Sequence, residues 1–326
     1  MSAPALRERR DPREAVATFA ADVRYYLTQQ PRQLPSHYLY DALGSALFDA
    51  ICELPWYPIT RAEMRLLHAH ARDLLGGAEL PNRLVELGAG NGTKLATLVS
   101  LGLPAGHPLS IELVDVSPAA LRTAASAVAG FERVQVVARE ATYEDGLQLM
   151  EARRGKERVL VLFLGSNIGN FDPVGAEQFL RRIRRALGPG DALLLGTDLV
   201  KPEAELLLAY DDPLQVTAAF NRNLLVRING ELDADFELGR FRHLAAWNPD
   251  ASRVEMHLVS TRHQGITVSA ADLEFEMTEG ESIWTESSYK FTREEIAAVL
   301  ARSGFQTDAQ WIDTADEFAL TLATAT

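Results

Sequence analysis

The chain has 326 residues, of which 47% are hydrophobic and 24% charged, so it is too apolar for disorder and long enough for two domains. Its net charge of -13 disfavours nucleic acid and anionic membranes as partners, because both bind clustered Lys and Arg. Cys52 is the only cysteine, which excludes a disulfide framework or a cysteine-rich zinc site and favours a reducing cytoplasm.

The N-terminal segment is not expected to be a signal or transit peptide. Acidic residues alternate with its arginines between residues 7 and 14, and no apolar run follows. The longest apolar run, residues 159–164, is far too short to cross a bilayer.

A glycine loop follows the first predicted buried strand, in the segment RLVELGAGNGTK at residues 83–94. Glu86 ends the strand, and Gly88, Gly90 and Gly92 allow the backbone to turn tightly and approach a ligand. A dinucleotide site prefers the spacing G-x-G-x-x-G, whereas this loop has G-x-G-x-G, followed by Lys94. The loop favours S-adenosylmethionine, although a plain strand-to-helix turn is the alternative.

Five short runs rich in Val, Leu and Ile alternate with helical stretches, which predicts a doubly wound parallel sheet. The runs are residues 84–87, 111–116, 134–137, 159–164 and 192–196. The helix before the fifth run is predicted to start at Asp172 as N-cap, with Pro173 in its first turn.

Residues 200–290 leave this pattern and carry alternating runs at 253–260 and 273–277, with turns predicted at 264–265 and 279–280. Thr292 and Glu295 then form a predicted capping box before a final helix, and two strand-like runs follow. A helix and hairpin after five parallel strands is typical of a class I methyltransferase sheet, whereas a dinucleotide Rossmann domain continues with a sixth parallel strand.

The predicted fold is therefore α/β: a class I methyltransferase Rossmann-like sheet with an inserted α+β substrate-binding domain. Residues 62–200 with 291–326 are assigned to the S-adenosylmethionine-binding domain. Residues 14–61 with 201–290 are assigned to the substrate-binding domain, which is expected to cover the crevice where open α/β sheets bind ligands.

Several polar residues follow the predicted strands. Asp115, after the second strand, can accept both ribose hydroxyls, and a solvated acid is its alternative role. Thr142 could bond adenine and Tyr143 could cover its face, unless Tyr143 is only a packing aromatic. Asn170 offers a donor and an acceptor suited to a zwitterionic amino acid, but Asn is also a common loop residue.

In the inserted segment, Glu286 and Ser288 would share one face of a strand, about 6.6 Å apart. A carboxylate and a hydroxyl at that spacing can serve both nitrogens of an imidazole, and a solvated strand face is the alternative. His68 and His70 are two residues apart and cannot chelate from one helix face, so no metal is expected.

In these residues the chain resembles the histidine-specific Nα-methyltransferases, which make the trimethylated histidine precursor of ergothioneine. The resemblance runs from about Tyr40 to the C-terminus and rests on YDALGSALFDAICELPWYPITRAE, VELGAGNGTK, DVSPAAL, FLGSNIGNF, LLLGTDLVK, AYDDPLQVTAAFNRN, RVEMHL and TESSYKF.

The resemblance implies a cofactor site for S-adenosylmethionine. Gly88, Lys94 and Asp115 would bind the cofactor, and Thr142 and Tyr143 would flank its adenine. The family usually has an acidic residue where Thr142 stands, so this chain departs from the pattern at the adenine contact.

It also implies a histidine site, made by Tyr57, Asn170, Tyr210, Glu286 and Ser288. Asn170 and Tyr210 would hold the amino-acid backbone and orient the reacting nitrogen, which makes them the catalytic pair. Glu286 and Ser288 would read the imidazole, and Met256 also matches the histidine-selective pattern.

The implied activity is transfer of methyl groups to the α-amino nitrogen of free L-histidine, giving hercynine. The alternatives are an Nα-methyltransferase for tyrosine or tryptophan, and a noncatalytic S-adenosylmethionine-binding module. A nicotinamide oxidoreductase fits less well. No coiled-coil pattern indicates a partner chain, so a monomer is expected. Its expected location is the cytoplasm, as the single cysteine indicates.

Overall fold

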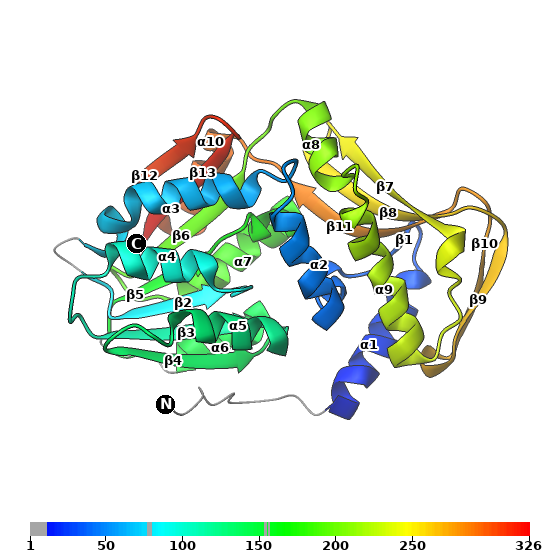
Figure 1. Ribbon diagram of the computed structural model, residues 1–326, viewed down its shortest axis with the longest axis horizontal. Helices are drawn as coiled ribbons and strands as arrows, with labels where there is room; N and C mark the ends of the chain where they lie inside the picture. The colour runs from blue at the N-terminus through cyan, green and yellow to red at the C-terminus, as the bar shows by residue number, and fades with distance from the viewer. Residues whose placement is uncertain (1–11, 77–79, 153–154, 156) are drawn as a thin grey trace. The chain divides into compact units, whose positions relative to one another are not determined.

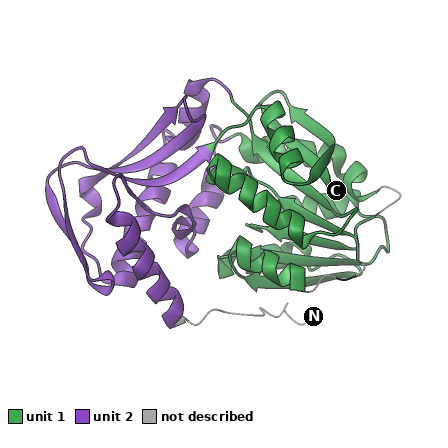
Figure 2. Ribbon diagram, turned by 180° about the vertical axis from the view of Figure 1, so that it is seen from behind, with its two compact units in different colours: residues 1–9, 58–200, 289–326 green, residues 10–57, 201–288 purple. Residues whose placement is uncertain are grey.

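The computed structural model describes residues 12–76, 80–152, 155 and 157–326. The arginine-containing segment at residues 7–14, for which no targeting signal was predicted, therefore lies largely outside the described residues. The chain forms two compact units (Figure 2). Among the described residues, unit 1 contains Pro58–Val200 and Tyr289–Thr326, and unit 2 contains residues 12–57 and Lys201–Ser288. The ligand assigned to each unit stays a prediction.

Unit 1 is built on a seven-stranded sheet with the order β12-β13-β6-β5-β2-β3-β4 (Figure 1). Its strands are β2 (Arg83–Leu87), β3 (Leu109–Asp115), β4 (Val134–Glu140), β5 (Val159–Phe163), β6 (Ala192–Asp198), β12 (Phe305–Asp313) and β13 (Phe318–Ala325). The first five are parallel, and β13 pairs antiparallel with both β6 and β12. This order confirms the predicted class I methyltransferase sheet and its terminal hairpin.

Helices lie against both faces of this sheet (Figure 1). They are α3 (Ile59–Leu75), α4 (Thr93–Gly102), α5 (Pro118–Val128), α6 (Tyr143–Ala152), α7 (Pro173–Ala186), α10 (Arg293–Arg302) and the short 3-10 helix η2 (Asn167–Asn170). The predicted N-cap is present, since Asp172 accepts the backbone N–H of Gly175 at 2.7 Å. The predicted capping box of Thr292 and Glu295 is also formed.

One hydrophobic core joins the sheet to α6, α7 and α10. Phe163 of β5 and Phe179 of α7 pack there with ring centroids 4.9 Å apart. Both β2 and β5 are buried along their whole length. Strand β5 is accordingly a continuous apolar run in the sequence, whereas β2 also buries the charged residues Arg83 and Glu86. The carboxyl ends of these strands carry the loops described below.

Unit 2 contains the predicted inserted α+β segment together with the preceding N-terminal helices. Its helices are α1 (Pro12–Leu27), η1 (Ser36–Leu39), α2 (Ala42–Cys52), α8 (Glu203–Tyr210), α9 (Val216–Leu232), η3 (Leu238–Arg240) and η4 (Ser269–Ala271). Its strands are β1 (Arg32–Gln33), β7 (Phe241–Asn248), β8 (Arg253–Ser260), β9 (Gln264–Val268), β10 (Leu273–Met277) and β11 (Ser282–Tyr289). The sheet order is β1-β11-β8-β7, and β9 and β10 form a separate hairpin.

One predicted turn in this unit is wrong. Gln264 and Gly265 begin strand β9, and the bend lies just before them. Gln264 pairs with Met277 across the hairpin, and its buried side chain donates to Ser260 Oγ at 2.6 Å. A long-range strand pairing therefore overrides the local turn preference of the Gln-Gly pair.

Within the described residues, no helix is both long enough and apolar enough to span a membrane.

Candidate functional site

The glycine loop between β2 and α4 requires glycine at several positions. Gly88, Gly90 and Gly92 have φ angles of 81°, 52° and 76°, in the left-handed region that side chains rarely adopt. A Cβ on Gly88 would lie 2.9 Å from the side-chain nitrogen of Asn167. A Cβ on Gly92 would lie 2.6 Å from the Cα of Ala124 in α5. The loop therefore makes the tight turn predicted from its glycines, while its approach to a ligand stays a prediction.

Asp115 holds this loop in place from the end of β3. One carboxylate oxygen accepts the Gly90 N–H at 3.1 Å, and the other accepts the Ser117 N–H at 2.8 Å. Burial raises the pKa of Asp115 above its ordinary value, while these backbone hydrogen bonds oppose the rise. Each oxygen can accept a further hydrogen bond, so the carboxylate remains suited to ribose hydroxyls.

Glu86 is the next-to-last residue of β2, and its surroundings show whether a cationic ligand fits beside it. The side chain is 3% exposed, and its Oε2 has no hydrogen-bond partner among the described residues. Burial raises its pKa to about 8, opposed by the Lys94 charge and helped by the charges of Glu63 and Asp115. Burying a carboxylate oxygen without a hydrogen-bond partner is unfavourable, and a cationic ligand group would be such a partner. S-adenosylmethionine carries an ammonium and a sulfonium, so these residues fit it.

Lys94, at the start of α4, forms an ion pair with Glu63 of α3, with its Nζ 2.5 Å from Glu63 Oε2. Both Glu63 oxygens also accept the N–H of Gly165 at 2.9 Å. None of the sequence motifs pointed to Glu63, although its position in the helix gives a signal. Glu63 stands in the apolar stripe of α3 beside Ala62 and Leu66, where a charged residue is unusual.

Thr142 and Tyr143 begin helix α6. The Thr142 hydroxyl accepts the backbone N–H of Asp145 at 3.2 Å, so it stabilises the first turn of the helix. The Tyr143 ring packs against Phe163 and Phe179, with centroid distances of 5.3 and 5.7 Å. Tyr143 therefore acts as a packing aromatic, which was the alternative role considered for it. Its contact with adenine stays a prediction.

The loop after β5 has unusual backbone geometry. Gly165 and Ser166 have φ angles of 75° and 59°, and the Ser166 hydroxyl accepts the N–H of Asp198 at 2.9 Å. A Cβ on Gly169 would lie 2.7 Å from the carbonyl oxygen of Tyr289, which favours glycine there. This loop leads into η2 and places Asn170, half-buried, in unit 1.

The other four residues predicted to bind histidine lie together in unit 2. The Tyr210 hydroxyl donates to Ser288 Oγ at 2.7 Å, and the Tyr57 and Tyr210 rings lie 6.4 Å apart. Tyr57, Tyr210 and Ser288 are buried. Burial is the main cause that raises the pKa of the Tyr57 phenol, and neighbouring ionisable groups, Glu286 among them, raise it further. The Glu286 carboxylate therefore lies close to this cluster.

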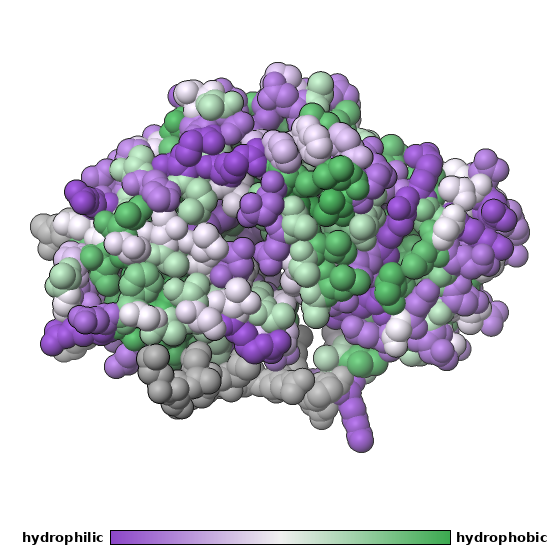
Figure 3. All heavy atoms as spheres, viewed as in Figure 1, coloured by the Kyte–Doolittle hydropathy of each residue, from purple (hydrophilic) through white to green (hydrophobic). Residues whose placement is uncertain are grey.

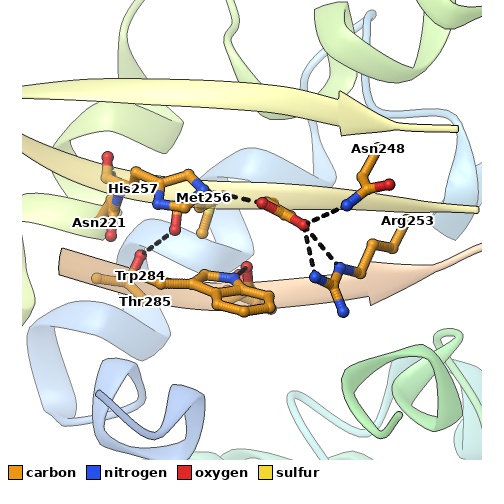
Figure 4. Close-up of polar contacts among 9 residues, drawn as sticks. Asn221, Asn248, Arg253, Met256, His257, Trp284 and Thr285 are labelled. Carbon is orange, nitrogen blue, oxygen red and sulfur yellow. Dashed lines mark hydrogen bonds and ion pairs between the residues drawn. The ribbon is translucent and has the colours of Figure 1, made fainter. Parts of the chain in front are cut away.

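The strands that carry Glu286 and Met256 are fixed by side-chain contacts (Figure 4). The Thr285 hydroxyl donates to the Met256 carbonyl at 3.0 Å, which joins β11 to β8. The Trp284 indole N–H donates to the Glu286 carbonyl at 2.8 Å. These bonds hold the backbone of both residues that match the histidine-selective pattern.

A polar network on β8 supports Trp284 in turn (Figure 4). Glu255 accepts from Asn248 at 3.0 Å and from Arg253 at 2.8 Å, and it lies 3.1 Å from the His257 ring nitrogen. The Arg253 guanidinium stands 4.3 Å from the centroid of the Trp284 ring. Alternation along β8 puts Arg253, Glu255 and His257 on one face, and strand pairing then brings Asn248 of β7 and Trp284 of β11 to them.

Comparisons with known proteins show which family the chain resembles. A family described as "Histidine-specific methyltransferase, SAM-dependent" matches residues 19–325. The chain is 41% identical to the histidine N-alpha-methyltransferase of Mycolicibacterium smegmatis over 314 residues, which is 95% of each chain. It is 41% identical to the enzyme of the same name from Mycobacterium tuberculosis over 93% of each chain. It is also 29% identical to ergothioneine biosynthesis protein 1 of Neurospora crassa, over 78% of this chain and 31% of that protein.

Proposed function

Because the chain belongs to the histidine-specific, S-adenosylmethionine-dependent methyltransferase family, we propose that it methylates the α-amino nitrogen of free L-histidine. Repeated transfer until the nitrogen is quaternary would give hercynine, the precursor for ergothioneine biosynthesis. The observation that carries this proposal is the buried cluster of Tyr57, Tyr210 and Ser288 with the Glu286 carboxylate beside it.

The cofactor is assigned to the loop residues of unit 1. Gly88 leaves room for the ligand, Asp115 accepts from the ribose hydroxyls, and Lys94 pairs with the carboxylate of the amino-acid end. Thr142 and Tyr143 are assigned to the adenine, at the start of α6. When bound, S-adenosylmethionine supplies an activated methyl group on a cationic sulfur.

The amino-acid substrate is assigned to five residues, Tyr57, Asn170, Tyr210, Glu286 and Ser288. The Ser288 hydroxyl already accepts from Tyr210, so it can donate its own proton to an unprotonated imidazole nitrogen. Glu286 would accept the proton of the other ring nitrogen. Asn170 and Tyr210 would orient the substrate amine, so that its nitrogen is aligned with the methyl group to be transferred.

Methyl transfer requires a neutral amine, because only that form has a free electron pair. Free α-amines titrate near pH 8, so most histidine must lose a proton before each early transfer. We assign no dedicated strong base to the site. The single-turnover rate at saturating substrate should therefore rise with pH from about 6 to about 9. A flat profile over that range would contradict this mechanism.

The direct test is to incubate the protein with S-adenosylmethionine and each of histidine, tyrosine and tryptophan, and to weigh the products by mass spectrometry. We expect addition of three methyl groups to histidine and little product from the other two. Methylated tyrosine or tryptophan as the main product would support the alternative Nα-methyltransferase. Cofactor binding without any methylated product would support the noncatalytic module.

A further inference from the structure

Glu63 is a buried carboxylate that the proposed reaction does not use directly. Its side chain is fully buried, yet it comes from α3, outside the glycine loop and the loop after β5. A Cβ on Gly196 of β6 would lie 1.9 Å from Glu63 Oε1, so β6 needs glycine to leave room for the carboxylate. The absence of a side chain at Gly196 therefore leaves space for the buried Glu63 carboxylate.

Glu63 joins the two loops that flank the carboxyl ends of β2 and β5. It accepts the N–H of Gly165 with both oxygens and pairs with the ammonium of Lys94. Gly165 is in the left-handed region, and a Cβ there would lie 3.2 Å from Lys94 Nζ. One carboxylate therefore sets the position of a backbone amide and a cation that stand close together.

The Lys94 side chain remains 21% exposed, whereas the Glu63 side chain is fully buried. A lysine on a flexible stem loses much side-chain entropy when a ligand immobilises it. The buried carboxylate removes that freedom in advance, which lowers the cost of binding an anion at the exposed side of the ammonium. The anionic group of S-adenosylmethionine is its α-carboxylate.

We propose that Glu63 is a positioning residue of the cofactor site, which holds Lys94 and Gly165 where Lys94 can bind the α-carboxylate of S-adenosylmethionine. This inference rests on the proposed assignment of Lys94 to the cofactor. It predicts that the contribution of Glu63 to cofactor binding passes through Lys94 and disappears when Lys94 is absent.

The experiment is a double-mutant cycle with Glu63→Gln, Lys94→Met and the combined variant. Binding of S-adenosylhomocysteine, which shares the α-carboxylate and is not turned over, is measured by calorimetry with the full-length protein. Glu63→Gln should weaken binding by about tenfold, within the range of coupling between contacting residues. The combined variant should bind no more weakly than Lys94→Met alone.

Controls separate positioning from general damage. Glu151→Gln neutralises an exposed carboxylate of α6 and should leave the affinity unchanged. If Glu63→Gln does not fold, as judged by circular dichroism, Glu63→Asp takes its place in the same cycle, because its shorter carboxylate cannot keep all three contacts.

The outcomes distinguish this inference from the proposed function. Unchanged affinity in the Glu63 variant, or losses that simply add to those of Lys94→Met, would overturn the positioning role. Failure of the unmodified protein to bind S-adenosylhomocysteine would instead contradict the cofactor assignment on which the proposed function depends.

Discussion

Glu86, beside the proposed cofactor site, is a buried carboxylate whose ionisation should affect stability. Burial raises its pKa from 4.5 to about 8 in the folded protein, whereas the unfolded chain keeps the ordinary value. The folded state therefore binds this proton more tightly, and stability is lost as pH rises from about 4.5 to about 8. A cationic ligand beside the carboxylate would reverse this effect.

We predict that Glu86→Gln stabilises the ligand-free protein at pH 8.5 but hardly at pH 5. The expected gain is a rise of a few degrees in melting temperature, because one pKa unit corresponds to about 1.4 kcal/mol. Thermal unfolding of both proteins across this pH range measures it. An equal difference at both pH values would show that Glu86 ionisation does not limit stability.

Glu286 is predicted to discriminate the histidine ring. Glu286→Ala should weaken histidine binding by about 10- to 100-fold, the loss typical of a hydrogen bond to a charged group. Calorimetry with histidine in the presence of S-adenosylhomocysteine tests this. Glu279→Ala, which removes an exposed carboxylate from the preceding turn, is the matched control. Unchanged affinity in Glu286→Ala would remove the residue from its assigned role.

At the scale of elements, the contact between the glycine loop and α5 should limit which substitutions are tolerated. Gly92 and Gly90 both have positive φ, but only Gly92 lies against the α5 backbone at Ala124. A Cβ on Gly90 would meet nothing within 4 Å. The two positions therefore differ in packing while sharing the same backbone preference.

We predict that Gly90→Ala costs about 1–2 kcal/mol, the usual cost of a left-handed alanine. Gly92→Ala should cost at least about 2 kcal/mol more, because α4 and α5 must also move apart. Urea unfolding of the ligand-free proteins measures both values. Equal destabilisation would mean that the loop relaxes without disturbing α5.

The elements themselves were predictable to different degrees. The buried parallel strands and the caps at Asp172 and Thr292 follow from local patterns, and the structure contains them. The bounds of the terminal strands depend on their partners, because β13 pairs with β6 and β12 pairs with β13. The turn expected at Gln264 fails for the same reason, since partners distant in the sequence decide strand ends.

For the whole molecule, oligomeric state stays a prediction. The net charge of -13 opposes self-association, and a monomer of 35.9 kDa is expected. Hydrophobic residues nevertheless gather over α8 and α9 on the face drawn in Figure 3, where Leu208 and Val226 are 39% and 42% exposed. Such a patch can mark an interaction surface.

Light scattering after size-exclusion chromatography, at several protein concentrations, should give the monomer mass throughout. A concentration-dependent mass that Val226→Glu returns to the monomer value would contradict the monomer prediction and identify α9 as an interface. The cytoplasmic location likewise remains a prediction from the single cysteine.

Local sequence patterns predicted the class of sheet, the glycine loop and the residues proposed for the two ligand sites, because periodicity, glycine spacing and strand-end acids are local properties. Only the tertiary structure decided which side chains meet. It paired Tyr210 with Ser288 within unit 2 and brought Glu63 to Lys94 and Gly165. It also left one Glu86 oxygen without a hydrogen-bond partner in the part of the chain that the structure describes. Contacts between residues far apart in the chain depend on how helices pack and strands pair, and a buried charge shows its role only when its neighbours are known.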